Sequence, residues 1–118
     1  MSWDCRLVDP VTHETLETDK LHDIAGGTYC LGGTREMWLS VTYNYGNIFR
    51  KVIPPDGIKT LEGVSGADSI PILEDAINKL ADDVDKDYWK PTEGNAKRAL
   101  HGVLALAKLR PDGVWEIC

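Results

Sequence analysis

Polar and aromatic side chains gather in the sequence between residues 42 and 50. Six of them could contact a nucleotide: Thr42, Tyr43, Asn44, Tyr45, Asn47 and Arg50. A tyrosine ring can stack on a base, an amide can read the hydrogen-bonding edge of that base, and an arginine can hold a phosphate with two parallel hydrogen bonds. We therefore predict that this segment forms one half of a binding pocket. In the competing interpretation the tyrosines belong to the core, Asn44 caps a helix, and Asn47 and Arg50 are ordinary surface residues.

The other half of the predicted pocket lies at the start of the last helix that the sequence predicts. Its four side chains are Thr92, Asn95, Lys97 and Arg98. Two cations are unusual there, because the helix macrodipole already makes this end positive. Free backbone N–H groups, a threonine or asparagine cap and two cations together could bind a phosphate. In the alternative interpretation both cations point into water or pair with Glu93 and the acidic residues 82–87.

The acidic residues 82–87 resemble a calcium loop only in part. Asp83, Asp85 and Asp87 have the spacing of its first three ligands. Tyr88, however, stands where the loop needs a glycine, and Gly94 stands where it needs a bidentate glutamate. We interpret the run as a solvated acidic segment and expect no metal.

The histidines and the glycine pairs match no catalytic or phosphate-binding motif. His13, His22 and His101 are not accompanied by a serine in a GxSxG turn, so we expect that the protein is not an enzyme and has no cofactor. The glycine pairs at 26–27 and 32–33 follow neither GxGxxG nor GxxxxGK[ST]. Glycine pairs of this kind more often form the turns on either side of a short strand.

Composition limits the partners and the compartment. The chain has 118 residues, enough for one domain (1–118) with its own core, and its net charge of −6 argues against binding DNA or RNA. A small phosphorylated ligand needs only a local group of cations. Cys5, Cys30 and Cys118 form no zinc or disulfide pattern. No apolar run is long enough for a membrane span, so we expect no membrane partner and a cytoplasmic location.

Hydrophobic periodicity predicts the elements that must position these residues. Alternation predicts antiparallel strands near residues 3–7, 15–18, 28–31 and 36–43. Apolar stripes then predict helices over about 45–53, 69–84 and 94–109, the second capped by Ser69. Strands followed by helices predict an α+β fold, a small N-terminal antiparallel sheet with three helices packed on one face. One small sheet leaves part of these stripes uncovered, so we also expect a homo-oligomer.

The segment WLSVTYNYGNIFRKV and the two helices after it resemble a family of small proteins of unknown activity from tailed phages and prophages. Members carry a segment like N-[IY]-T-x-N-x-x-x-[MF], an amphipathic helix, and a second helix that ends near P-x-x-V-W. The resemblance covers roughly residues 26–117, and it places the Thr and the second Asn of that segment on Thr42 and Asn44. Ser40 stands where the family has its first Asn. The resemblance implies a phage accessory protein that acts in the host cytoplasm.

Two hypotheses of function follow from these patterns. In the first, the protein binds and sequesters a small nucleotide-type immune signal, a cyclic nucleotide or an ADP-ribose derivative, and so counters host defence. In the second, it is an inhibitor or adaptor that binds a host defence enzyme or a virion component, with Trp38 or Trp89 as an anchor. An enzyme ranks below both, because no residues are arranged as acid, base and nucleophile.

Overall fold

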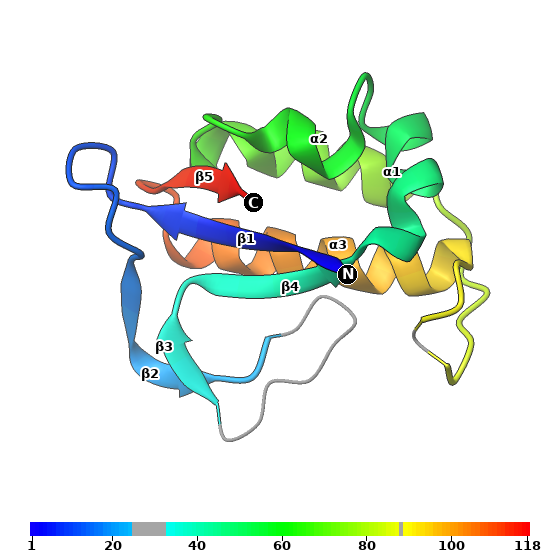
Figure 1. The fold of residues 1–118 in the computed structure, drawn as a ribbon, viewed down its shortest axis with the longest axis horizontal. Helices are drawn as coiled ribbons and strands as arrows, with labels where there is room; N and C mark the ends of the chain where they lie inside the picture. Colours follow the sequence, from blue (N-terminus) through cyan, green and yellow to red (C-terminus); the bar gives the residue numbers. More distant parts are fainter. Residues whose placement is uncertain (25–32, 88) are drawn as a thin grey trace.

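The computed structural model describes residues 1–24, 33–87 and 89–118, with a small sheet packed on helices (Figure 1). The strands are β1 (Ser2–Val8), β2 (Glu17–His22), β3 (Thr34–Glu36), β4 (Trp38–Thr42) and β5 (Val114–Ile117). The helical segments are η1 (Tyr43–Tyr45), α1 (Gly46–Val52), η2 (Gly57–Leu61), α2 (Gly66–Asn78) and α3 (Glu93–Leu109). The α+β class that the sequence predicts is confirmed.

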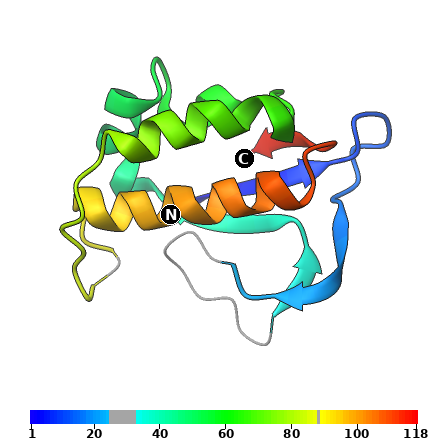
Figure 2. The same cartoon turned by 180° about the vertical axis from the view of Figure 1, so that it is seen from behind.

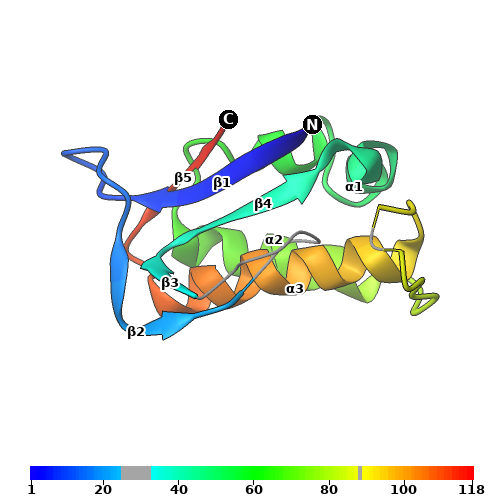
Figure 3. The same ribbon diagram turned by 60° about the horizontal axis from the view of Figure 1, so that its bottom comes forward.

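The main sheet has β1 in the middle, antiparallel to β4 on one side and to β5 on the other. Cys5 of β1 pairs with Leu39 of β4, and Leu7 of β1 pairs with Trp115 of β5. All four side chains are buried, and they share a face because alternate residues of a strand point the same way. This face is turned toward α2 and α3 (Figure 3). The opposite face carries polar residues such as Arg6.

The strands β2 and β3 form a second, two-stranded antiparallel sheet. Met37, between β3 and β4, joins the two sheets. Its carbonyl accepts a hydrogen bond from the Leu7 amide (2.9 Å), and its own amide donates to the carbonyl of Leu16 (2.8 Å). The predicted strand at 28–31 and the glycine pair at 26–27 lie outside the described residues.

The helices α2 and α3 run side by side across the inner face of the main sheet (Figure 2). Their apolar residues are buried, among them Leu73, Ile77, Leu100 and Val103. The sequence analysis expects a homo-oligomer because the sheet would leave part of the apolar helix stripes uncovered. Because these stripes are buried within the single chain, they give no support to an oligomer. No helix in the described part of the chain is long and apolar enough to cross a membrane.

Strand β5 and helix α2 differ most from the sequence prediction. The prediction places no strand after residue 44, but β5 pairs with β1 and buries Trp115 and Ile117. The helix α2 is capped by Ser65, whose Oγ accepts from the Asp68 amide (3.0 Å), and it ends at Asn78 rather than near residue 84. Ser69, the predicted cap, is instead buried inside α2 and accepts a hydrogen bond from the indole of Trp115 (2.9 Å).

Candidate functional site

The turn from β4 into η1 positions the first half of the predicted pocket. Thr42 is buried, and its Oγ1 accepts a hydrogen bond from the Asn44 amide (3.2 Å). Asn44 is exposed and donates from Nδ2 to the carbonyl of Trp89 (2.8 Å). Tyr45 is fully buried, with its ring edge-on to Phe49. Thr42 and Tyr45 therefore shape the turn from inside, and Asn44 reaches outward to another segment.

Tyr43 and Arg50 lie on the surface beside Trp3. The side chain of Tyr43 is 41% exposed, and its ring stands edge-on to Trp3 with 4.7 Å between ring centroids. Arg50 is exposed and donates a hydrogen bond to Oδ1 of Asn47. A Cβ added at Gly46 would lie 3.3 Å from Nη1 of Arg50 and 3.4 Å from Cη2 of Trp3, so both side chains pack over this glycine. The aromatic–arginine surface consists of Trp3, Tyr43, Asn44, Asn47 and Arg50.

The start of α3, the second half of the predicted pocket, is already capped by the chain itself. Thr92 Oγ1 accepts from the Asn95 amide (3.1 Å), and Oδ1 of Asp83 accepts from the Gly94 amide (2.9 Å). A carboxylate near a helix N-terminus is stabilised by the macrodipole. Asp83 thus occupies the position that the sequence analysis assigns to a bound phosphate.

Asn95 is the residue that holds the loop before α3 in place. Its side chain is only 3% exposed. Oδ1 accepts from the Asp85 amide (3.0 Å), and Nδ2 donates to the carbonyls of Asp87 (3.0 Å) and Lys90 (3.1 Å). With all these bonds made inside the protein, the Asn95 amide positions the loop rather than a ligand.

The two predicted cations of α3 differ in their surroundings. Lys97 donates from Nζ to Oδ1 of Asp82 (2.7 Å) and to the carbonyl of Leu80 (3.4 Å). This contact holds the pKa of the Asp82 carboxyl below its ordinary value. Arg98 is exposed and forms no ion pair with a described residue. Lys97 therefore pairs with the acidic segment, and Arg98 remains open to solvent.

The two halves of the predicted pocket meet through the loop before α3. Asn44 bonds to the carbonyl of Trp89, and Asn95 bonds to the carbonyl of the next residue, Lys90. The helix α1 and the start of α3 accordingly lie at the same end of the molecule (Figure 1). Trp3 and Trp89 also belong to this end, and the sequence analysis did not include them in the pocket. No local sequence pattern predicts that Trp3 lies here. Its position follows from the pairing of β1 with β4, which brings Ser2 opposite Thr42.

No family model, curated protein or solved structure matches the chain.

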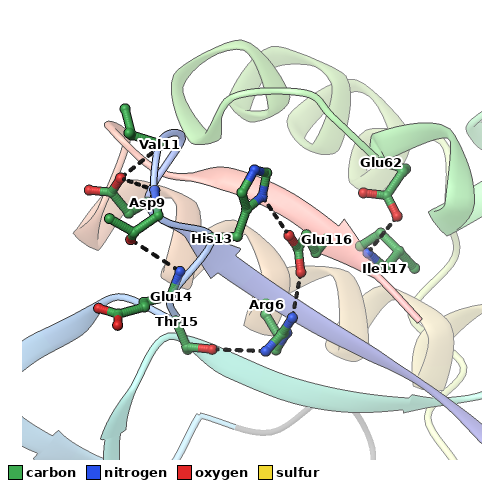
Figure 4. Close-up of polar contacts among 10 residues, drawn as sticks. Arg6, Asp9, Val11, His13, Glu14, Thr15, Glu62, Glu116 and Ile117 are labelled. Atoms are coloured by element: carbon green, nitrogen blue, oxygen red, sulfur yellow. Dashed lines mark hydrogen bonds and ion pairs between the residues drawn. The ribbon is translucent and has the colours of Figure 1, made fainter.

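A second polar cluster lies on the outer face of the main sheet, where β1 and β5 meet the turn after β1 (Figure 4). One oxygen of Glu116 accepts a hydrogen bond from Arg6, and the other lies 3.1 Å from Nδ1 of His13. Arg6 also donates to Oγ1 of Thr15 (3.2 Å). The sequence analysis missed this cluster because Arg6 and Glu116 are 110 positions apart.

The turn that carries His13 is tightly closed. The carboxylate of Asp9 accepts from the amides of Val11 (2.8 Å) and Thr12 (3.0 Å). His13 itself has a φ of 61°, in the left-handed region that side chains with a Cβ seldom adopt. The His13 ring is thereby directed toward Glu116 although its side chain is 68% exposed.

The ionised forms of both carboxyl groups in this cluster are stabilised. The hydrogen bond from His13, followed by that from Arg6, lowers the pKa of Glu116 below its ordinary value of 4.5. The backbone N–H groups of Thr12 and Val11 lower the pKa of Asp9. Glu116 is therefore a carboxylate at neutral pH, and it can only accept hydrogen bonds.

A cavity of about 150 Å³ lies beside this cluster. Its apolar lining comes from Val8, Pro10 and Val114, and its ionisable lining comes from His13, Glu62 and Glu116. Oε1 of Glu62 accepts from the Ile117 amide (3.2 Å). Pro10, His13 and Glu62 are exposed, so the cavity can be reached from solvent.

Proposed function

We propose that this protein binds a small phosphorylated, nucleotide-type ligand on the aromatic–arginine surface. One observation carries the proposal. The guanidinium of Arg50 is exposed, has no carboxylate partner among the described residues, and lies over Gly46 next to the indole of Trp3. In a chain of net charge −6, an arginine without an acidic partner, next to a Trp3 ring that itself packs on Tyr43, suits a ligand with both a phosphate and a base.

Each exposed member of the surface has a role in this proposal. Tyr43 provides a ring on which a base can stack, and Arg50 holds the phosphate. Asn44 and Asn47 keep amide groups available for the polar edge of the base, although each already makes one hydrogen bond within the protein. In this proposal Arg50 binds the phosphate rather than the start of α3, where Asp83 caps the helix and Lys97 pairs with Asp82, so that only Arg98 of the two predicted cations is left there.

The biological setting of the proposal comes from the resemblance of the 38–52 segment to phage proteins. A phage protein that binds a signalling nucleotide in the host cytoplasm lowers its free concentration, and thereby counters the defence that the signal activates. A protein of this kind acts by stoichiometric binding, so it needs no catalytic group.

Isothermal titration calorimetry with cyclic dinucleotides, cyclic mononucleotides and ADP-ribose tests the proposal. We expect at least one of these ligands to bind the wild-type protein. Arg50→Ala should weaken that binding by about tenfold or more, since a hydrogen-bonded charge pair contributes roughly 1.5–3 kcal/mol. Tyr43→Ala should weaken it by a similar factor, because a stacked base contributes roughly 1–3 kcal/mol.

The matched control for this experiment is Lys51→Ala, which removes the neighbouring exposed cation of α1. It should leave the affinity nearly unchanged. The proposal fails if none of the nucleotides binds, or if Arg50→Ala and Lys51→Ala have equal effects. Light scattering on the same samples determines whether the protein is an oligomer.

A second candidate function is favoured by the large exposed side chains at the same end of the molecule. Trp89 is 42% exposed, and Tyr43 and Val84 are exposed as well. Exposed aromatic residues of this kind are frequent anchors in protein interfaces. An inhibitor or adaptor of this type would capture one host protein in stoichiometric amount, and added nucleotides would not release it.

A further inference from the structure

The structure points to a second ligand site, in the cavity between the turn after β1 and residues 62–63. We propose that this cavity binds a small organic ammonium ion with an apolar group about the size of one aromatic ring. The site is separate from the aromatic–arginine surface, because Trp3 lies near the start of β1 and Val8 is its last residue.

The size of the cavity sets the size of the apolar group. Its volume is about 150 Å³ and it is open to solvent on one side; a fully enclosed apolar cavity of that volume holds one benzene ring. Val8, Pro10 and Val114 provide apolar lining. The space therefore suits a group of six or seven carbon atoms.

The polar lining of the cavity sets the charge of the ligand. Glu116 is a carboxylate, so the hydrogen bond between it and His13 requires the proton on Nδ1. In the neutral ring Nε2 is then an acceptor, and Nε2 has no hydrogen-bond partner among the described residues. Oε2 of Glu62 is also an acceptor without a described partner. A ligand that satisfies both must donate hydrogen bonds, and an ammonium group does so with a charge opposite to that of Glu62.

The carboxylate of Glu62, rather than that of Glu116, is available to a ligand. Both oxygens of Glu116 are engaged, one by Arg6 and one by His13. Glu62 has no cationic partner among the described residues and uses only one oxygen, to accept from the Ile117 amide. The ammonium group is therefore expected beside Glu62, with His13 as its second acceptor.

Titration of the ¹⁵N-labelled protein with benzylammonium, followed by amide chemical shifts, tests this site. We expect saturable shifts at His13, Gly63 and Val114. Benzyl alcohol should bind at least about tenfold more weakly, because it lacks the charge that strengthens the hydrogen bond to Glu62. Benzoate should not bind, because its carboxylate would meet two acceptors.

Two variants and a matched control make the test specific. Glu62→Gln keeps an oxygen for the Ile117 amide but removes the charge, and should weaken benzylammonium binding by about tenfold. Val114→Phe should block binding by filling the cavity. Glu14→Gln, which neutralises an exposed carboxylate on the same turn but outside the cavity lining, should leave the affinity unchanged.

Three results would overturn the inference. One is the lack of any shift at cavity residues up to about 10 mM benzylammonium, a concentration that would largely saturate a site with a dissociation constant of about 1 mM, or roughly −4 kcal/mol. The others are equal binding of benzyl alcohol, and equal effects of Glu62→Gln and Glu14→Gln. Arg50→Ala should not change this titration, so the two proposed sites can fail independently.

Discussion

At the scale of single residues, two of the three asparagines of the predicted pocket, Asn47 and Asn95, have different roles. Asn95 makes three hydrogen bonds from inside the protein to the loop before α3. Asn47 is exposed and contacts Arg50 on its own helix. Their residue type and spacing predict that both could bind a ligand. Burial distinguishes them, and burial depends on contacts that the sequence does not display.

This difference gives a prediction about stability. Asn95→Ala should lower the free energy of unfolding by about 1–3 kcal/mol, because it removes three hydrogen bonds and leaves part-buried backbone groups without partners. Asn47→Ala, the control, should change it by less than about 0.5 kcal/mol, as exposed substitutions usually do. Urea denaturation of both variants measures the two effects. Similar losses in both would contradict the structural role assigned to Asn95.

At the scale of elements, regular patterns could be predicted and long-range partners could not. The alternation of Leu39 and Val41 predicts β4, and the apolar stripe of α3 predicts that helix nearly to its ends. The strand β5 was missed because four residues are too short to display a clear period, and Glu116 is the single polar residue between Trp115 and Ile117. The same limit applies to the candidate site. Of the six residues predicted for its first half, Thr42 and Tyr45 are buried, and the cap that Asp83 places on α3 comes from a loop contact.

That loop contact gives a prediction about α3. A Cβ at position 94 would lie 2.5 Å from the backbone nitrogen of Val84 and 2.6 Å from the carbonyl carbon of Asp83. Gly94→Ala should therefore destabilise the protein by about 1–3 kcal/mol through overpacking, although alanine favours an α-helix over glycine by about 1 kcal/mol.

The control for Gly94→Ala is Gly46→Ala in α1. There the added Cβ meets the ends of the Arg50 and Trp3 side chains at 3.3–3.5 Å. The flexible Arg50 can move aside, so this change should have a clearly smaller effect. Thermal unfolding followed by circular dichroism compares the two variants. If Gly94→Ala unfolded at the same temperature as Gly46→Ala or at a higher one, the loop would not pack on the helix as described.

At the scale of the whole molecule, several carboxyl groups are stabilised as carboxylates on different parts of the surface. The pKa of Asp82 is lowered by Lys97, that of Asp112 by Arg110, and that of Glu116 by His13 and Arg6. Backbone N–H groups lower the pKa of Asp9 and Asp85. The contacts of Asp82 and Glu116 attach the loop before α3, the turn after β1 and the last strand to one another or to the rest of the fold, whereas those of Asp9, Asp85 and Asp112 are local. Part of the negative charge of the chain is therefore engaged in ion pairs and hydrogen bonds within the protein.

This arrangement predicts how stability depends on pH. Because these pKa values are lower in the folded protein, the unfolded chain binds more protons as the pH falls through the ordinary carboxyl range. The free energy of unfolding should therefore be fully developed above about pH 5, and should fall as the pH drops through the folded-state pKa values below about 4. Urea denaturation at pH 7, 5 and 3 measures this dependence.

Glu116→Gln should reduce the loss of stability between pH 5 and pH 3, because one of the groups that binds protons on unfolding is gone. A stability that stays constant or rises on acidification would mean that these contacts do not favour the carboxylate forms in solution.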